Sequence, residues 1–354
     1  MRRSYFASLS NEQTATPAVR SDIAEHAHGR HDWFRTHMLP WMSPHLRRAG
    51  TRVVEVGCGT GSQAAAMAQE GASVLGIDIS APSLDAARQR CELMGLSGTE
   101  FVLRDASEVC GAVRERGPFD TVLLFAVLEH QRPVERLETL RVCWESLDPG
   151  GHMVVGDTPN RLTWTDRHTS LLPFFMSLPE DVAREYAAFS PREGLRADMR
   201  RTPNREAANL LLARWGMGVS FHEFEAALGD LSGLVVADGF DPPLCDVMPV
   251  TLEERLLYTY WLSRGVAAPV AFVRENLFVI LRKPGGEVPR ARTVPALLKP
   301  LPMEQVGVRG AVRAWATRAA ERLKRAVRGA GPSAGPGGEA DLRSGVNRAR
   351  RRGP

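Results

Sequence analysis

The sequence predicts an α/β protein with a mostly parallel sheet and helices on both of its faces. Strand-like and helix-like segments alternate from Thr51 to about residue 159, and the alternation returns between residues 218 and 283. Such strand–helix–strand units form right-handed crossovers on a parallel sheet that is covered on both faces. A hydrophobic share of 44% and a charged share of 24% are those of an ordinary globular protein.

The expected strands are short apolar runs rich in β-branched residues. They lie at 52–56, 73–80, 99–106, 119–130, 151–159, 231–240 and 276–284. The expected helices lie at 62–71, 82–95, 133–147, 220–230 and 254–265. The segment 82–95 is typical, because it has proline at its start and glycine at its end.

These segments divide the chain into five regions. Residues 1–50 form an N-terminal helical region, in which we expect the first 20 or so residues to be loose and Pro40 and Pro44 to interrupt the helices. Residues 51–159 form a ligand-binding core, 160–217 an inserted lid, and 218–283 the rest of the sheet. Residues 284–354 are rich in Pro, Gly and Arg, and we expect a basic linker, an amphipathic helix and a disordered tail.

Cysteine usage and hydropathy indicate a cytosolic protein. The five cysteines have no C-x-x-C spacing, so we expect reduced thiols and no metal site. No apolar run approaches the length of a spanning helix, and the N-terminus has two arginines without an apolar stretch behind them. The sequence therefore argues against a secretory signal.

The glycine-rich stretch "VVEVGCGTG", residues 53–61, is the strongest functional signal. Gly57, Gly59 and Gly61 lack the Cβ atoms that would collide with a ligand where a strand turns sharply into a helix. Asp78 ends the second strand, where a carboxylate can accept both hydroxyls of a ribose. The spacing G-x-G-x-G, preceded by the acidic Glu55, suits an amino group and a sulfonium better than a pyrophosphate.

Five motifs in this order resemble the class I S-adenosylmethionine-dependent methyltransferases. They are "EVGCGTG", "GIDIS", "RDA", "FDTVLLFAVLEH" and "LDPGGHMVV". The resemblance covers residues 51–160 closely and extends loosely to 283. It implies a Rossmann-like fold with a seven-stranded sheet and S-adenosylmethionine as the cofactor. Another nucleotide ligand and a methyltransferase-like protein without activity stay open as alternatives.

The resemblance also implies which residues hold the cofactor. Glu55 and the glycine loop would hold its amino-acid end, Asp78 its ribose, and Asp105 with Ala106 its adenine. The full expected set is Glu55, Gly57, Cys58, Gly59, Gly61, Asp78, Ile79, Asp105, Ala106 and Phe125. Glu129 and His130 follow the fourth strand, where they could line the methyl-transfer cavity or only begin a helix.

The stretch "DTPNRLTWTDRHTSLLPFF", residues 157–175, follows the fifth strand and is the expected acceptor site. Arg161 and Arg167 could hold a phosphate or carboxylate, and Trp164 could stack on a sugar or exclude water. The alternative is a lid whose aromatic side chains pack on the sheet. This stretch also resembles that of bacterial methyltransferases of surface-glycan or ubiquinone-like pathways.

The expected activity is methyl transfer to a hydroxyl of a sugar, glycan intermediate or quinone-like small molecule. His168 is the first candidate for the general base and His222 the second. A nitrogen or carbon acceptor and a non-catalytic regulatory or scaffold role are the alternatives. A nucleic-acid substrate is disfavoured, because the chain lacks the (N/D/S)-P-P-(Y/F) motif after the fourth strand and a basic stripe with aromatics.

Charge is distributed unevenly along the chain. Residues 284–354 carry 15 basic and 5 acidic side chains, whereas the first 283 residues carry 30 basic and 36 acidic ones. Within the tail, residues 309–328 have apolar side chains at helical spacing and seven basic side chains. This pattern suits peripheral contact with an anionic membrane, at its inner, cytoplasmic face. Binding to nucleic acid or a partner protein and a solvated tail helix are the alternatives.

Overall fold

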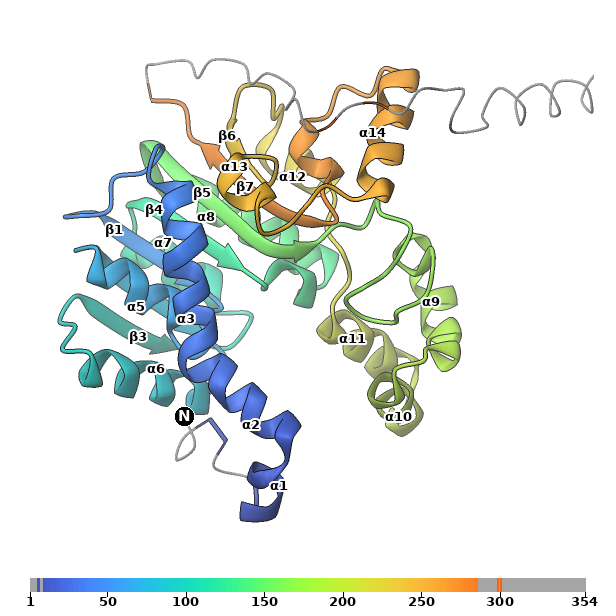
Figure 1. The fold of residues 1–354 in the computed structure, drawn as a ribbon, viewed down its shortest axis with the longest axis horizontal. Helices are drawn as coiled ribbons and strands as arrows, with labels where there is room; N and C mark the ends of the chain where they lie inside the picture. Colours follow the sequence, from blue (N-terminus) through green and yellow to red (C-terminus); the bar gives the residue numbers. More distant parts are fainter. Residues whose placement is uncertain (1–4, 7–8, 286–297, 299, 301–354) are drawn as a thin grey trace, which may run out of the picture. The chain divides into compact units, whose positions relative to one another are not determined.

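The computed structural model describes residues 5–6, 9–285, 298 and 300 (Figure 1). A seven-stranded sheet with the strand order β3-β2-β1-β4-β5-β7-β6 forms the core. The strands are β1 (Arg52–Val56), β2 (Ser73–Asp78), β3 (Thr99–Leu103), β4 (Phe119–Phe125), β5 (Leu147–Pro159), β6 (Val235–Asp238) and β7 (Asn276–Arg282). The predicted Rossmann-like fold with a mostly parallel seven-stranded sheet is confirmed.

The strand order reverses between β1 and β4. After β3 at one edge, the chain crosses back to place β4 on the other side of β1, and both strands run parallel to each other. Only β7 is antiparallel, and it lies between β5 and β6. Open α/β sheets bind ligands beyond the carboxyl ends of the strands at such a reversal. The topology therefore predicts a ligand site at the carboxyl ends of β1 and β4.

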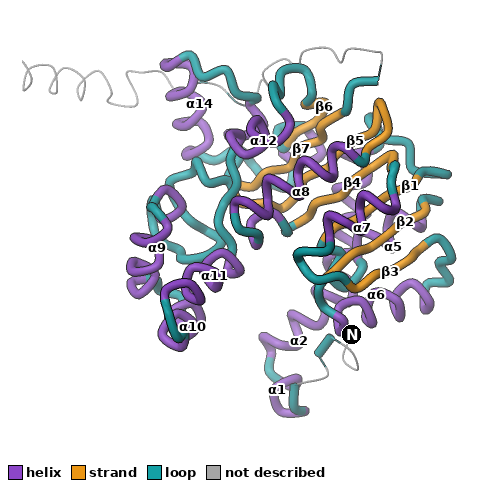
Figure 2. Tube along the Cα trace, turned by 180° about the vertical axis from the view of Figure 1, so that it is seen from behind, coloured by secondary structure: helices purple, strands orange, loops and turns teal. Residues whose placement is uncertain are grey.

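Helices cover both faces of the sheet (Figures 1 and 2). One face packs against α7 (Val109–Arg116), α8 (Pro133–Glu145), α12 (Phe221–Leu228) and α14 (Leu252–Arg264). The other face packs against α5 (Ser62–Gln69), α6 (Ala81–Leu93), α13 (Pro242–Cys245) and the N-terminal helices. Neighbouring residues of β1 divide between the two cores, with Val54 in the first and Val53 in the second, as the two-residue period of a strand requires. The sequence pattern did not indicate α7 or α13.

Residues 17–42 form a nearly continuous rod, and the extended residue Thr16 separates it from the short helix α1 (Asn11–Ala15). The rod comprises α2 (Pro17–Ala24), the π turn η1 (Glu25–Gly29), α3 (Arg30–Trp33), the π turn η2 (Phe34–Met38) and α4 (Leu39–Met42). The expectation of a loose chain up to about residue 20 is wrong for its second half, because Ser10 and Thr16 cap α1 and α2. Pro40 does not break the rod, since it lies in the first turn of α4, where proline is tolerated.

The segment after β5 forms a lid with its own small apolar core. Its elements are η4 (Phe175–Ser177), α9 (Glu180–Tyr186), η5 (Ala187–Phe189), α10 (Glu193–Arg201) and α11 (Arg205–Trp215). Their buried residues include Phe175, Leu195 and Leu212, which form a cluster separate from the two cores of the sheet. Figure 2 shows α9, α10 and α11 beside the sheet, beyond the carboxyl end of β5.

Two further observations concern membrane contact. None of the helices among the described residues is long and apolar enough to span a bilayer. The expected membrane-binding segment, residues 309–328, lies outside the residues that the structure describes.

Candidate active site

The loop after β1 leaves room for a ligand at one glycine in particular. Gly57, Gly59 and Gly61 all have positive φ angles, of 71°, 52° and 71°. A Cβ at Gly57 would lie 2.7 Å from Cγ2 of Val127, and one at Gly61 would lie 2.7 Å from Cβ of Ala87. At Gly59 a Cβ would meet no atom within 4 Å. The outer two glycines thus permit close packing of the loop, while Gly59 borders open space.

Asp78 at the end of β2 is tied to this loop. Its Oδ2 accepts a hydrogen bond of 2.8 Å from the backbone N–H of Gly59, and its Oδ1 accepts one of 2.8 Å from Ser80. Each carboxylate oxygen can accept a further hydrogen bond, as binding of ribose hydroxyls would require. The next residue, Ile79, is 61% exposed and offers an apolar surface at the same edge of the sheet.

Glu55 is a buried acid beneath the glycine loop. It is only 1% exposed, and its Oε2 has no hydrogen-bond partner among the described residues. Burial, together with the nearby charge of Asp78, raises the pKa of Glu55 to about 8. A bound cationic amino group would compensate this carboxylate, so the site fits the amino-acid end of S-adenosylmethionine. Burial likewise raises the pKa of Cys58 and keeps its thiol neutral.

The other residues expected at the cofactor differ in their placement. Asp105 and Ala106 are exposed just after β3, and the backbone N–H of Asp105 donates to Glu108. Phe125 is buried, and its ring packs edge-to-face on Phe34 with the ring centroids 5.4 Å apart. Its side chain therefore belongs to the core of the sheet.

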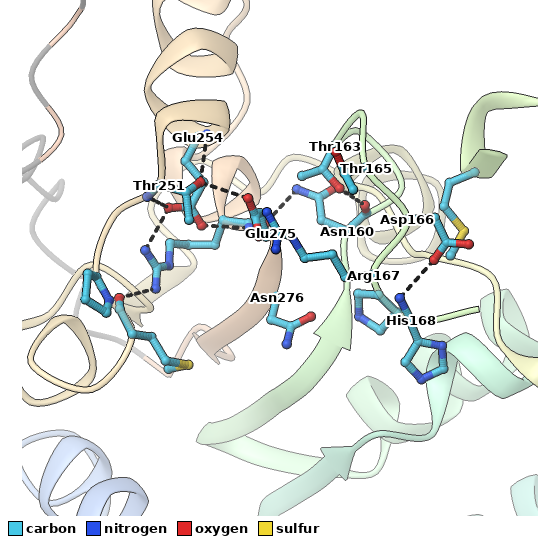
Figure 3. A pocket seen from close by; sticks show the side chains of 15 residues that line it. Asn160, Thr163, Thr165, Asp166, Arg167, His168, Thr251, Glu254, Glu275 and Asn276 are labelled. Atoms are coloured by element: carbon cyan, nitrogen blue, oxygen red, sulfur yellow. Dashed lines mark hydrogen bonds and ion pairs between the residues drawn. The ribbon is translucent and has the colours of Figure 1, made fainter. Parts of the chain in front are cut away.

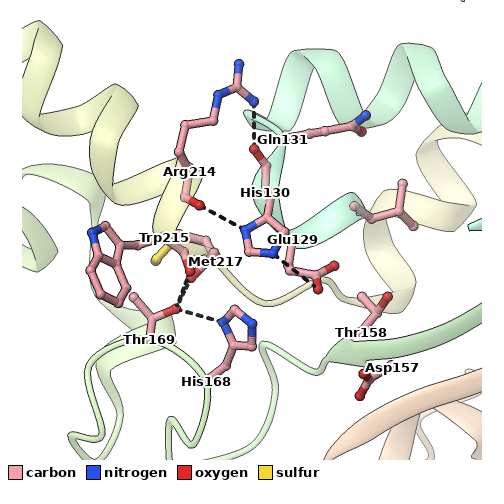
Figure 4. Close-up of polar contacts among 12 residues, drawn as sticks. Glu129, His130, Gln131, Asp157, Thr158, His168, Thr169, Arg214, Trp215 and Met217 are labelled. Atoms are coloured by element: carbon pink, nitrogen blue, oxygen red, sulfur yellow. Dashed lines mark hydrogen bonds and ion pairs between the residues drawn. The ribbon is translucent and has the colours of Figure 1, made fainter. Parts of the chain in front are cut away.

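A cluster of one carboxylate and two imidazoles lies where the lid meets the sheet (Figure 4). Glu129 and His130 belong to the 3-10 turn η3 (Leu128–His130) after β4, and His168 belongs to the loop after β5. One ligating atom from each of the three lies within 4.8 Å of the others. We call these three residues the Glu–His–His cluster. The structure thus brings together three of the residues predicted from sequence.

Glu129 is fully buried, and neither of its carboxylate oxygens accepts a hydrogen bond from the described residues. Burial, together with the charge of Asp157, raises the pKa of Glu129 to about 8. A buried carboxylate without partners is costly, and a cation or a protonated group beside it would remove that cost.

In both imidazoles of the cluster the hydrogen bonds place the proton on Nδ1, so that Nε2 is an acceptor. His130 Nδ1 lies 2.9 Å from the carbonyl oxygen of Arg214, which can only accept, so Nδ1 carries the proton. His168 Nδ1 lies 3.1 Å from Oγ1 of Thr169, whose hydroxyl donates to the carbonyl of Gly216. Burial lowers the pKa of both histidines, which favours their neutral forms.

Gly216 allows the two rings to approach each other. Its φ of 112° is in the region that favours glycine, and a Cβ there would lie 2.5 Å from Cε1 of His168 and 3.3 Å from Cε1 of His130. The ring centroids of the two histidines are 5.5 Å apart. The next residue, Met217, donates its N–H to the carbonyl of Glu129 at 2.8 Å, which attaches the lid to η3.

Backbone strain is concentrated at the same place. Ala126 and Asp157 have φ angles of 49° and 50°, and they lie at the carboxyl ends of the adjacent strands β4 and β5. The N–H of Ala126 donates to the carbonyl of Gly156 at 3.1 Å. Non-glycine residues in this conformation are typical of functional sites, where the surrounding structure holds them.

A cavity of about 310 Å³ opens beside His168, between the loop after β5 and the loop before α14 (Figure 3). Each of its two arginines is paired with a glutamate, and Asp166 adds a third carboxylate to the lining. Arg167 Nε lies 3.0 Å from Oε2 of Glu275, and Arg274 pairs with Glu254 at 2.9 Å in a buried salt bridge. The predicted anion site at Arg167 is therefore already occupied by a carboxylate of the chain. Arg161 and Trp164 are partly buried and do not line this cavity.

His222 lies apart from the other candidates. It is exposed on α12, its ring stacks on Phe221 with 3.9 Å between centroids, and its Nδ1 lies 3.2 Å from Oγ of Ser220. It lines neither the cavity nor the Glu–His–His cluster. Sequence reasoning also missed Thr169 and Gly216, since their role depends on contacts between the lid loop and the end of α11.

Comparison with known families identifies the sheet and its glycine loop. Residues 53–151 match the profile of a family described as "Methyltransferase domain". This part of the chain is therefore similar to a methyltransferase domain. The family match confirms the prediction made from the motifs, and the cofactor of this family is S-adenosylmethionine.

Similar proteins match about a third of the chain. A "Ubiquinone biosynthesis O-methyltransferase" of Ralstonia nicotianae is 36% identical over 116 residues, which are 32% of this chain and 46% of that protein. A protein of the same name from Stutzerimonas stutzeri is 34% identical over 113 residues, 32% of this chain and 47% of that protein. The chain thus matches about half the length of these relatives.

Solved structures that match the domain are more distant. Magnesium protoporphyrin IX methyltransferase from Synechocystis, with bound S-adenosylhomocysteine, is 24% identical with a TM-score of 0.32. The match covers 39% of this chain and 60% of that one.

Proposed function

We propose that the protein is an S-adenosylmethionine-dependent methyltransferase that methylates a hydroxyl group of a small molecule. The observation that carries this proposal is the Glu–His–His cluster, which faces the carboxyl ends of β4 and β5 next to the glycine loop. The cofactor supplies, when bound, a methyl carbon already activated by its sulfonium. The chain must then align an acceptor oxygen with that carbon and remove a proton.

Three features support cofactor binding at the carboxyl ends of β1 and β2. Gly59 borders open space, Asp78 has remaining capacity to accept hydrogen bonds, and Glu55 is a buried carboxylate without a partner for Oε2. We propose that Glu55 faces the amino group, Asp78 the ribose hydroxyls, and Ile79 with Asp105 and Ala106 the adenine. The side chain of Phe125 is buried in the core, so we propose that Phe125 contributes to this site only by fixing the position of β4.

The acceptor would bind between the cluster and the cavity beside it. His168 belongs to both, and we propose that it contacts the acceptor hydroxyl. The paired charges of the cavity favour an uncharged polar acceptor, because no cationic side chain lining it lacks an acidic partner among the described residues. A sugar or glycan intermediate fits this lining, and the named activity of the relatives favours a quinone-like phenol. Both acceptors present the hydroxyl that the mechanism needs.

The proposal includes a peripheral membrane contact through residues 309–328. Its support is the sequence pattern of seven basic side chains around an apolar stripe with one tryptophan. A lipid-linked acceptor would bring its hydroxyl to a protein held at that surface.

Release of S-adenosylhomocysteine tests this function. The full-length protein is assayed with uncharged methyl glycosides and with catechols, and we expect release with at least one of these classes. His168→Ala should lower kcat/KM by about 100-fold or more, since it removes a side chain that positions the acceptor hydroxyl or takes its proton. His222→Ala is the matched control, because His222 is exposed on α12 and outside the cluster.

Two results would contradict the proposal. Binding of S-adenosylhomocysteine without turnover of any acceptor would favour a regulatory or scaffold role instead. An unchanged kcat/KM for His168→Ala would remove His168 from the acceptor site.

A further inference from the structure

We propose that Glu129, His130 and His168 bind one divalent first-row metal ion, such as Zn²⁺. The ligands come from two separate segments, so no spacing in the sequence indicates them. The site rests on the proposed function, because its ion would hold the acceptor oxygen in the same active site.

The positions of the ligating atoms support a three-ligand site. The three atoms lie within 4.8 Å of one another, and His130 Nε2 is 3.8 Å from Oε1 of Glu129. Ligands about 2.0–2.1 Å from a tetrahedral Zn²⁺ lie about 3.3 Å apart. Small rotations of the two histidine side chains would therefore close the site around an ion.

Hydrogen bonds already orient both histidines as metal ligands. The Nδ1–H of His130 donates to a carbonyl, and that of His168 donates to the hydroxyl of Thr169, which is fixed by a second carbonyl. Metal-binding histidines use this arrangement, in which one ring nitrogen is held by a carbonyl or hydroxyl and the other faces the ion. Gly216 provides the space in which the two rings meet.

The buried carboxylate is the independent observation that points to a cation. Glu129 is 0% exposed, and neither oxygen accepts a hydrogen bond from the described residues. The two arginines nearest to it in sequence have other partners: Arg132 donates to Glu135, and Arg136 donates to the carbonyls of Leu128 and Gly218 and to Glu223. A metal ion between Glu129 and the two imidazoles would give this carboxylate a partner.

The donor set selects the type of ion. Mg²⁺ and Ca²⁺ prefer oxygen ligands, whereas two imidazoles with one carboxylate suit Zn²⁺ and neighbouring transition metals. Three protein ligands leave a tetrahedral ion one open position, as in catalytic zinc sites. The acceptor hydroxyl would take that position.

Coordination would then activate the hydroxyl. The bound oxygen releases its proton to water more readily, because the cation stabilises the resulting alkoxide. A lone pair of that oxygen forms the new bond to the methyl carbon, while the carbon–sulfur bond breaks and its electron pair stays on sulfur. In this scheme His168 is a ligand that positions the acceptor, and the proton passes to solvent.

Calorimetric titration of the metal-stripped, full-length protein with Zn²⁺ tests the site without an acceptor. We expect one tight site in the wild type and much weaker binding of Mg²⁺. His168→Ala and the near-isosteric Glu129→Gln should each weaken Zn²⁺ binding by at least about 10-fold. His222→Ala should bind as the wild type does. Wild-type affinity in both His168→Ala and Glu129→Gln would overturn the proposal.

Two glycine variants test the geometry of the same site. Gly216→Ala should weaken Zn²⁺ binding, because its Cβ would displace the ring of His168. Gly229→Ala is the matched control, since Gly229 also has a positive φ, of 83°, but faces open space. Circular dichroism confirms that each variant is folded. Equal Zn²⁺ affinity in the two variants would contradict the assigned geometry.

The absorption spectrum of the Co²⁺-substituted protein identifies the type of ligand. A thiolate charge-transfer band would show that the ion binds to cysteines, which would overturn the proposal.

Methyl transfer measured before and after metal removal distinguishes failure of the metal site from failure of the proposed function. If the protein binds no Zn²⁺ and still transfers the methyl group, the metal site is refuted and the proposed function is not. If the protein binds Zn²⁺ at this site but transfers no methyl group to any acceptor, the proposed function is refuted and the metal site is not.

Discussion

The buried carboxylate of Glu55 lowers the stability of the folded chain when it is ionised, and the same carboxylate is the proposed partner of the amino group of the cofactor. In the ligand-free chain its carboxylate is buried, and the pKa is raised from 4.5 to about 8 by that burial. Between these two values the folded state binds more protons than the unfolded state at this residue. The free energy of unfolding should therefore fall as the pH rises through this window. Binding of a cationic amino group would offset the cost.

We predict that Glu55→Gln reduces this pH dependence. Glutamine has nearly the same shape and does not ionise, so the variant should lose less stability than the wild type between pH 5 and pH 8.5. Urea unfolding at the two pH values measures the difference. The same variant should bind S-adenosylhomocysteine more weakly, because the charge that faces the amino group is gone. Parallel stability losses in the two proteins would show that Glu55 does not titrate as described.

The residues of the site differ in how far sequence could reveal them. Gly57, Gly59 and Asp78 act through a turn and two strands that are adjacent in sequence, so their motif is visible in the chain. Gly216 resembles any glycine at the end of a helix, and only the approach of His168 and His130 shows why it is needed. Its function depends on three segments that meet only after folding.

The N-terminal rod is fastened to the cofactor loop by one buried side chain of α6. Arg90 donates from Nε to the carbonyl of Thr60 at 3.0 Å and from Nη1 to that of Ala27 at 2.9 Å, and it also donates to the carbonyl of His26. Thr60 belongs to the glycine loop, and the other two residues belong to the π turn η1. This link couples the rod to the loop that faces the cofactor.

Arg90→Ala should release the rod. Loss of the guanidinium leaves carbonyl groups without partners, which should lower the free energy of unfolding by about 2 kcal/mol or more. We also expect faster proteolytic cleavage within residues 17–42. Arg88→Ala is the matched control, because Arg88 lies on the same helix with its side chain 49% exposed. Similar cleavage of the two variants would show that Arg90 does not fasten the rod.

Most elements of the sheet and the helical character of the N-terminal region could be predicted, whereas α7 and the continuity of the N-terminal rod could not. Strands such as β1 and β4 are short apolar runs, and their burial on both faces makes them visible in sequence. The helix α7 has eight residues, and its three charged residues all lie at its C-terminal end, so it shows no clear alternation of apolar and polar faces. The rod contains π turns and Pro40, which local rules treat as interruptions.

At the scale of the whole chain, the separation of acidic and basic residues predicts which part binds to an anionic membrane. The first 283 residues carry an excess of acidic groups, and residues 284–354 an excess of basic ones. An anionic surface should therefore attract the tail and repel the body.

We predict that the full-length protein co-sediments with vesicles that contain anionic lipid and that a chain without residues 284–354 does not. Since β7 ends at Arg282, this deletion keeps every strand of the sheet. Binding of the full chain should weaken as salt screens the charges. Equal sedimentation of the two proteins would contradict a membrane role of the tail.

The sequence by itself determined the fold class, the glycine loop and the cofactor, because these depend on local patterns along consecutive strands and helices. It also placed Glu129, His130 and His168 in the region of the active site. The tertiary structure alone decided that these three converge, that His222 lies elsewhere, and that Arg167 is neutralised by Glu275. Such contacts join segments far apart in the chain, and their geometry is set by how the lid packs on the sheet.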